Sequence, residues 1–127
     1  MILVDTHVVV WLRTDPDRLG AGARAAIESA DEIAISDISL WELSMLVSRG
    51  RLALDRPLAA YLDDVSRSSR VLPISAAVAT AVAGLPETFP TGDPADRIIY
   101  ATALVHGLPL LSADAGLLAY DDTVIWR

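Results

Sequence analysis

Short apolar runs alternate along the chain with longer segments in which apolar positions recur at helical spacing. Four of the runs have the uniformly apolar character of strands that are buried on both faces. These runs are residues 2–4, 33–35, 71–74 and 109–111. A fifth run, residues 124–126, is the candidate for a final strand at the edge of the sheet.

The intervening segments predict helices. Residues 57–69 have one apolar face, which contains Leu58, Tyr61 and Val65. The segment 36–39 supplies capping residues for a helix that ends near position 49. The other predicted helices are 8–12, 21–30, 75–85, 94–106 and 115–120. Strands that alternate with helices predict an α/β fold with a mainly parallel sheet of four to five strands and right-handed crossovers.

The length of 127 residues is typical of one domain, so a single domain over residues 1–127 is predicted. The chain begins with Met1 and three apolar residues without a basic region, so no signal peptide is expected. Two long charge-free stretches, 71–86 and 98–113, contain Pro and Gly and are shorter than the ~20 residues of a membrane span. The chain has no cysteine and so no disulfide framework, which fits a cytoplasmic location. No membrane anchor is expected either.

The formal net charge of −7 argues against nonspecific adhesion to nucleic acid, which normally uses a basic surface. Carboxylates gathered around a cation would account for part of that charge. All ten basic residues are arginine, which favours paired contacts with carboxylate or phosphate. Arg49, Arg51 and Arg56 form a loose cluster, which is either solvated surface or a set of phosphate contacts.

Residues 92–104, which read G-D-P-A-D-R-I-I-Y-A-T-A-L, combine a helix start with two carboxylates. Asp93 is a good capping residue, Pro94 suits the first helical position, and Gly107 is the predicted stop. Asp96 follows Asp93 by about one turn, at the positive end of the helix dipole. The two acids form either a variant of the capping box or part of a metal site.

Three further carboxylates lie at positions where a site can form. Asp5 and Asp114 each follow a predicted strand, at the end of a parallel sheet where α/β proteins place their sites. Each of the two could instead cap the helix that follows it. Glu42 has apolar helical neighbours such as Ile38 and Met45, although buried carboxylates are normally paired or metal-bound. A salt bridge to an arginine is the alternative for Glu42.

These acids together indicate a metal site. Clustered carboxylates repel one another and must be protonated or bound to a cation. Mg²⁺ prefers oxygen ligands, and it often keeps waters and binds substrate phosphates. The absence of cysteine and the presence of only two histidines disfavour zinc. The set therefore predicts metal-dependent chemistry on a phosphodiester.

Four short motifs in the chain carry a family resemblance. They are V-D-T-H at 4–7, S-L-W-E-L at 39–43, D-P-A-D-R-I-I-Y-A-T-A at 93–103 and L-S-A-D at 111–114. In order and approximate spacing the chain resembles the PIN-domain family, most closely its VapC-like ribonuclease toxins of type II toxin–antitoxin pairs. The resemblance implies a PIN-like three-layer sandwich and an endoribonuclease that depends on Mg²⁺ or Mn²⁺.

The resemblance also implies roles for individual residues. The catalytic acids it implies are Asp5, Glu42, Asp96 and Asp114. The implied metal ligands are the same four together with Asp93, an additional acid of the D-P-x-D variety. The residues implied to support these acids or to contact the substrate are Thr6, His7, Arg97 and Ser112.

The chain departs from the family pattern at three positions. His7 stands where many PIN domains have asparagine, so its role in contacting substrate or supporting the acids stays open. Ser112 and Ala113 replace the threonine and arginine that often precede the last acid. Ser112 keeps the hydroxyl group, whereas Ala113 supplies no basic side chain.

The partners that the resemblance implies are an RNA substrate, a cognate VapB-like antitoxin and a second copy of the chain in a homodimer. An acidic site suits inhibition by an inserted antitoxin arginine, which would pair with Asp5 or Asp96. The expected contact region for partners is the apolar helix around Glu42, which carries Trp41, together with the helix 57–69. The antitoxin is expected to bind over residues 49–69.

Other classes of protein fit the chain less well. A receiver-type signalling domain typically needs a lysine, and the chain has none. A haloacid-dehalogenase-like phosphatase needs a second aspartate two residues after Asp5, where His7 stands. A catalytically inactive PIN-like binding module is the main alternative, and the presence of all four acids counts against it.

Overall fold

The computed structural model describes all 127 residues and has a four-stranded sheet at its centre. The strands are β1 (Ile2–Val4), β2 (Ile33–Ser36), β3 (Arg70–Leu72) and β4 (Leu110–Leu111). They lie in the order β3-β2-β1-β4, and every neighbouring pair is parallel. The predicted α/β class and mainly parallel sheet are therefore confirmed.

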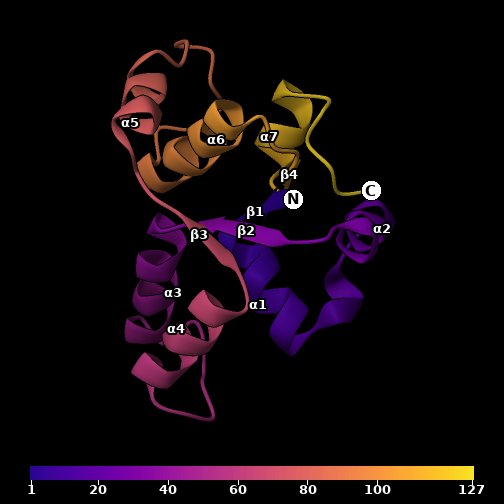
Figure 1. Cartoon of the computed structure of the whole chain (residues 1–127), viewed down its shortest axis with the longest axis vertical. Coiled ribbons are helices and arrows are strands. Elements are labelled where there is room, and N and C mark those ends of the chain that lie inside the picture. The colour runs from indigo at the N-terminus through magenta and orange to yellow at the C-terminus, as the bar shows by residue number, and fades with distance from the viewer.

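Seven α-helices and one short 3-10 helix cover the two faces of this sheet (Figure 1). The segments α1 (Thr6–Thr14), η1 (Pro16–Arg18), α2 (Ala21–Ser29), α3 (Ile38–Ser48) and α4 (Leu58–Arg67) lie on one side. The helices α6 (Pro94–His106) and α7 (Ala115–Tyr120) lie on the other side, where α5 (Ala76–Ala83) packs against α6. The predicted three-layer sandwich is confirmed.

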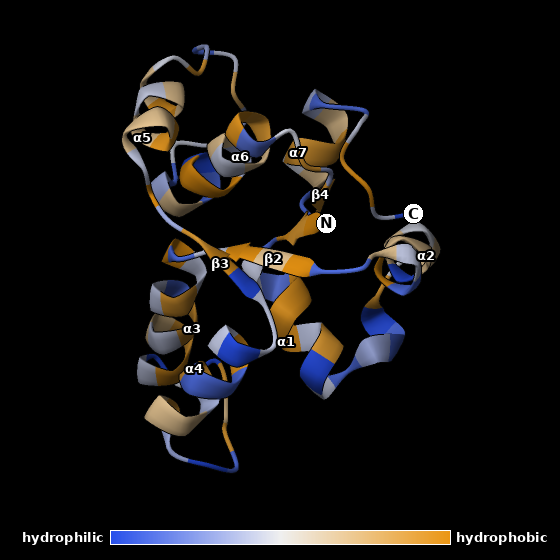
Figure 2. Cartoon of the chain, in the orientation of Figure 1, coloured by the Kyte–Doolittle hydropathy of each residue, from blue (hydrophilic) through white to orange (hydrophobic).

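Two apolar cores lie on opposite faces of the sheet because successive side chains of a strand point to opposite faces. Ile2 and Val4 join one core, which also contains Leu43 of α3. Leu3, between them in the sequence, joins the other core with Ile99 of α6. Figure 2 shows β1 and β2 as largely apolar elements between helices of mixed surface. Burying one such side chain contributes about 1.5–3 kcal/mol, which is why these short strands are well defined.

The strand order places a topological switch point between β1 and β4. From β1 the chain moves outward through β2 to β3, and it then returns to the far side of β1 as β4. The connections before β3 cover one face of the sheet, and the connection from β3 to β4 covers the other. The carboxyl ends of β1 and β4 therefore border a crevice, which is where open α/β sheets bind ligands.

The two predicted strands at the edges are shorter than expected. β3 ends at Leu72 because Pro73, which has no N–H group, cannot continue the hydrogen-bonded ladder. The run 124–126 contributes a single parallel bridge between Ile125 and Leu111. The Ile125 N–H donates to the carbonyl of Leu110 at 2.9 Å, so this segment still covers the edge of β4.

The C-terminal segment is fixed by a close approach to α2. A Cβ atom on Gly20 would lie 2.0 Å from the carbonyl oxygen of Trp126, so only glycine fits there. The Ala23 N–H donates to the same carbonyl at 3.0 Å. This anchoring holds the Trp126 side chain next to His7, at the border of the crevice.

The ends of several helices agree with the capping residues that the sequence offers. Gly107 ends α6 with a left-handed φ of 61°. The Ser75 hydroxyl accepts the Val78 N–H and begins α5. The first helix is longer than predicted and begins at Thr6, directly after Asp5. None of the helices has both the length and the apolar character that crossing a bilayer requires.

Candidate active site

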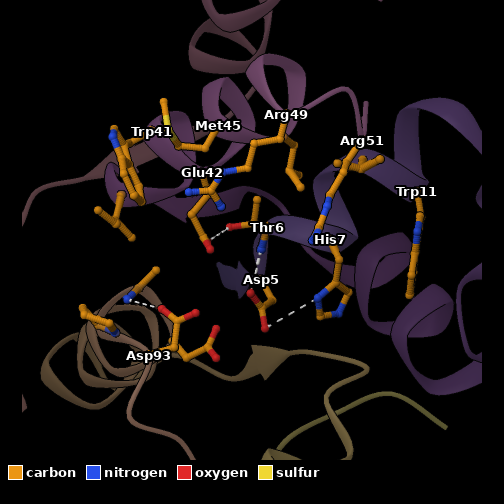
Figure 3. Close-up of a pocket in the computed structure, with 16 residues that line it drawn as sticks. Asp5, Thr6, His7, Trp11, Trp41, Glu42, Met45, Arg49, Arg51 and Asp93 are labelled. Atoms are coloured by element: carbon orange, nitrogen blue, oxygen red, sulfur yellow. Dashed lines mark hydrogen bonds and ion pairs between the residues drawn. The ribbon is translucent and has the colours of Figure 1, made fainter. Parts of the chain in front are cut away.

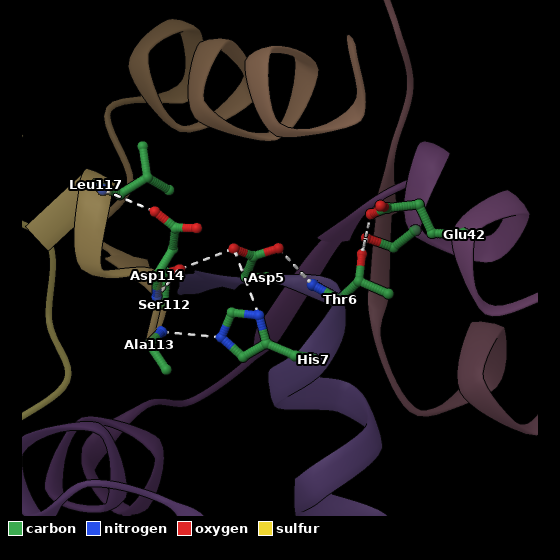
Figure 4. A network of polar contacts seen from close by, with 9 residues as sticks. Asp5, Thr6, His7, Glu42, Ser112, Ala113, Asp114 and Leu117 are labelled. Atoms are coloured by element: carbon green, nitrogen blue, oxygen red, sulfur yellow. Dashed lines mark hydrogen bonds and ion pairs between the residues drawn. The ribbon is translucent and has the colours of Figure 1, made fainter. Parts of the chain in front are cut away.

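Asp5 ends β1 and is held from two sides (Figure 4). The Thr6 N–H donates to its Oδ1 atom at 2.8 Å, and the Ser112 hydroxyl donates to its Oδ2 atom at 2.8 Å. Only 5% of Asp5 is exposed. Asp5 therefore caps α1 and also faces the crevice, so the two interpretations of this residue are compatible.

Glu42 projects from α3 toward the same crevice. The Thr6 hydroxyl donates to its Oε1 atom, and the Ser39 hydroxyl lies 2.8 Å from the Thr6 hydroxyl. Because Thr6 has one hydroxyl hydrogen and gives it to Glu42, Ser39 is the donor in the second bond. Glu42 forms no ion pair with an arginine, so the salt-bridge alternative is wrong. Burial raises the pKa of Glu42, and the charges of Asp5 and Asp93 act in the same direction, against the Thr6 hydrogen bond.

Asp93 and Asp96 lie on the first turn of α6. The Asp93 Oδ1 atom accepts the Ala95 N–H at 2.9 Å, which makes Asp93 the N-cap that the sequence predicts. The Asp93 N–H donates to the Thr91 hydroxyl and not to Asp96, so the two acids do not form a reciprocal capping box. Asp96 is thus free of a capping role and lines the crevice.

The pKa of Asp96 is raised from 3.8 to about 7, and burial is the largest cause. The next contributions, in decreasing order, are the negative charges of Asp5, Asp93, Glu42 and Asp114. These acids come from four separate parts of the chain, so the fold has brought the predicted carboxylates together. Such mutual repulsion is what a bound cation would relieve.

The raised pKa of Asp96 predicts a pH-dependent stability difference in metal-free protein. Ionising Asp96 is harder in the folded than in the unfolded chain, so stability is lost as the pH rises from 3.8 through about 7. Asp96→Asn removes this loss. In EDTA, the melting temperature of Asp96→Asn should exceed that of the wild type by a margin that grows from pH 4 to pH 7 and then stays constant. Thermal unfolding monitored by circular dichroism measures this margin. A margin that does not change with pH would contradict the raised pKa of Asp96.

Ser112 and Asp114 follow β4, beside Asp5. The Ser112 hydroxyl donates to Asp5 and accepts the Asp114 N–H at 3.1 Å, so it joins the ends of the two neighbouring strands. The Asp114 Oδ1 atom accepts the Leu117 N–H at 2.9 Å and caps α7. Asp114 is exposed and does not line the cavity, but its charge acts on Asp96.

His7 connects the ends of β1 and β4 at the other border of the site. Its Nε2 atom accepts the Ala113 N–H at 2.8 Å, so the hydrogen of the neutral ring is on Nδ1, 3.8 Å from the Asp5 Oδ2 atom. Burial lowers the pKa of His7, against the charges of Asp5 and Asp114. The ring packs against Trp11 and Trp126, with centroids 4.9 and 6.0 Å away.

Arg97 is directed away from the other candidate residues. Its Nε atom donates to the Thr91 carbonyl at 2.8 Å, and its guanidinium group lies 5.4 Å from the centre of the Phe89 ring. It does not line the cavity. Its contacts place it in support of the loop before α6, and not beside Asp5.

A cavity of about 950 Å³ joins these groups (Figure 3). Four carboxylates line it: Asp5, Glu42, Asp93 and Asp96. The lining also includes apolar and basic side chains of α1, α3 and the segment after α3: Val10, Trp11, Ile38, Trp41, Met45, Leu46, Arg49 and Arg51. A space of this size admits a ligand much larger than a single ion.

The chemistry of the donor set fits a hard divalent cation. Every carboxylate of the cluster offers oxygen, and the His7 Nε2 atom is already engaged by Ala113. No three of the acidic or histidine side chains converge closely enough to form a complete cage. Mg²⁺ needs no such cage, because it keeps several waters and binds through one or two carboxylates.

The model of the PIN domain family matches residues 2–122. The chain therefore belongs to the PIN domain family, as the four motifs suggested.

The chain is similar to a named ribonuclease and to chains of known structure. Over 116 residues the chain is 42% identical to Ribonuclease VapC22 of Mycobacterium tuberculosis, an alignment that covers 91% of this chain and 88% of that protein. A toxin–antitoxin complex from Klebsiella pneumoniae contains a chain with the same fold, at a TM-score of 0.72 and 22% identity, over 98% of this chain and 95% of that one. FitAcB from Neisseria gonorrhoeae is similar at a TM-score of 0.67 and 26% identity, over 100% and 97% of the two chains.

Proposed function

We propose that this protein is a metal-dependent endoribonuclease and the toxin of a toxin–antitoxin pair. Its membership of the PIN domain family and its 42% identity to a ribonuclease support the activity. The observation that carries the proposal is the convergence of Asp5, Glu42, Asp93 and Asp96 on one cavity at the carboxyl end of the sheet. The substrate is RNA, and the reaction is hydrolysis of its phosphodiester bonds.

Asp5, Asp93 and Asp96 are the residues that would hold Mg²⁺ or Mn²⁺, and Glu42 and Asp114 would hold a second ion or orient water. A bound ion of this kind makes water more acidic and neutralises phosphate charge. The protein supplies the orientation of the carboxylates. Thr6 and Ser112 fix the two oxygens of Asp5 by the hydrogen bonds described above.

Glu42 is the group best placed to orient the attacking water. Its Oε1 atom is held by the Thr6 hydroxyl, which Ser39 supports in turn. The Oε2 atom has no such partner and remains available to accept a hydrogen bond from water in the cavity. The sequence indicates Ser39 only as a capping candidate and as part of a motif, because its contact with Thr6, 33 positions away, depends on the fold.

The activity is tested by incubating the purified chain with a labelled single-stranded RNA in Mg²⁺ or Mn²⁺, with the same DNA sequence as a control. Cleavage of the RNA alone, stopped by EDTA and restored by added Mg²⁺ or Mn²⁺, is the expected result. Cleavage that continues in EDTA would contradict the metal-dependent mechanism. An absence of cleavage, with metal binding retained, would support the inactive binding module.

The solved structures similar to this chain support an antitoxin partner, because they are toxin–antitoxin complexes. In our proposal an antitoxin arginine pairs with Asp5 or Asp96 and silences the enzyme in the cytoplasm. A homodimer is also proposed, for which the exposed side chains of Leu104 and Val105 offer apolar surface on α6. Co-expression with a small adjacent gene should yield an inactive complex, and a complex that cleaves RNA as fast as the free chain would contradict this.

A further inference from the structure

One wall of the cavity is a single face of α3, which also carries Glu42. Its members recur at helical spacing, from Ile38 at the start of the helix to Arg49 at its end. Leu43, on the opposite face of the helix, is fully buried in the core. A largely apolar helix is normally enclosed by protein. In α3, the side that carries Ile38, Met45 and Leu46 faces the open cavity, which indicates that a ligand covers it.

Arg49 and Arg51 stand at one end of this wall without a partner. Neither side chain forms an ion pair, a hydrogen bond or a contact with an aromatic ring. Apart from the C-terminal Arg127, each other arginine has such a contact; these are Arg13, Arg18, Arg24, Arg56, Arg67, Arg70 and Arg97. In a chain with a net charge of −7, two unpaired guanidinium groups in one cavity form a site for an anion.

Trp41 lies on the same wall, and 54% of it is exposed. Figure 3 shows its ring, Arg49 and Arg51 around the side of the cavity that Glu42 also borders. An exposed aromatic ring and arginines along one wall form the combination on which single-stranded nucleic acids bind, since bases stack on the ring and phosphates contact the cations. Along the axis of α3, Arg49 is about 10 Å from Glu42, at a rise of about 1.5 Å per residue.

We infer that this wall is a binding subsite for nucleotides next to the cleaved bond of a single-stranded RNA. Arg49 and Arg51 bind backbone phosphates, and a neighbouring base stacks on Trp41. The inference rests on the proposed function, because it takes RNA as the substrate of the acidic site. An RNA chain suits both ends of the cavity. At one end its phosphates would contact a cation bound by the acids, and at the other end they would contact the guanidinium groups of the arginines. The antitoxin, whose arginine we propose at Asp5 or Asp96, would need an acidic side chain in addition to occupy the end of the cavity at Arg49 and Arg51.

The double variant Arg49→Ala/Arg51→Ala tests the phosphate contacts. The matched control is Arg24→Ala/Arg67→Ala, which removes the same charge from exposed positions outside the cavity. Binding of a labelled phosphorothioate RNA, which resists cleavage, is measured in Mg²⁺ by fluorescence anisotropy at several salt concentrations. The cavity variant should bind about tenfold more weakly than the wild type and lose roughly 0.7 of salt slope for each phosphate contact removed. The control should keep the wild-type affinity and salt slope.

Variants of Trp41 distinguish the stacking of a base from the phosphate contacts of the arginines. Trp41→Ala should weaken RNA binding without changing the salt slope, and Trp41→Phe should recover most of the binding because a ring is restored. Thermal unfolding checks that both variants fold, which the exposure of Trp41 favours.

Three outcomes overturn the inference. One is a cavity variant that binds RNA as well as its control does, and another is a Trp41→Ala variant with wild-type affinity. The third is a cavity variant that keeps its RNA binding but no longer forms the antitoxin complex. That result would assign the wall to the antitoxin. A wild-type chain that binds RNA through this wall but cleaves none would contradict the proposed function and leave the subsite in place.

Discussion

Replacing Asp5 by asparagine is expected to slow RNA cleavage about a thousandfold or more without unfolding the protein. The substitution removes the charge at the centre of the acid cluster but nearly preserves the shape of the side chain. The asparagine oxygen can still accept the Thr6 N–H, and Ser112 can rotate its hydroxyl to accept from the new amide. Single-turnover cleavage at saturating Mg²⁺ measures the loss, and circular dichroism checks the fold.

Ser112→Ala provides a graded comparison for Asp5→Asn. It removes one of the two hydrogen bonds that hold Asp5 and keeps every carboxylate. We expect a smaller loss of activity, because Asp5 keeps its charge and its bond to Thr6. If Asp5→Asn retained activity comparable to that of Ser112→Ala, Asp5 would not be the central acid of the site.

Glu42→Gln and Asp96→Asn are each expected to remove most of the cleavage activity, and the double variant should lose little more than either alone. Residues that act as one unit in catalysis show this kind of non-additivity. The physical basis is their mutual charge interaction, which extends from Glu42 on α3 to Asp96 on α6. Single-turnover rates of the three variants measure this non-additivity. If the loss of rate in the double variant equalled the product of the two single losses, the two acids would act independently.

Asp93→Ser separates capping from metal binding within the same experiment. Serine keeps an N-cap for α6 and removes the charge. We expect a smaller loss than for Asp96→Asn, because the Asp93 carboxylate is engaged with the Ala95 N–H. Activity as low as that of Asp96→Asn would show that Asp93 contributes as much to metal binding as Asp96 does.

The sequence predicts the α/β fold well because its signals are local. Uniformly apolar runs gave β1 and β2, and capping residues such as Ser75 and Gly107 marked the helix ends. The last strand was overestimated because its pairing depends on distant residues. In the fold, Ile125 forms a single bridge with Leu111, and Trp126 passes close to Gly20.

The acids of the site were predictable one by one, whereas their contacts were not. Ser112 and Asp5 are 107 positions apart and meet because the topology returns β4 beside β1. The bond from Ser39 through Thr6 to Glu42 likewise depends on how α3 sits over the end of β1. The orientation of Arg97 depends on Phe89, whose ring no helical or strand pattern places next to it.

In our proposal, RNA cleavage depends on cation binding at these acids. The most direct test is a calorimetric titration of the wild type and Asp96→Asn with Mn²⁺, paired with cleavage rates over the same Mn²⁺ concentrations. The wild type should show binding and cleavage that reach half of their maximum at the same Mn²⁺ concentration, and Asp96→Asn should lose both together. Cleavage that persists in Asp96→Asn, or that saturates at a concentration unrelated to binding, would contradict the claim.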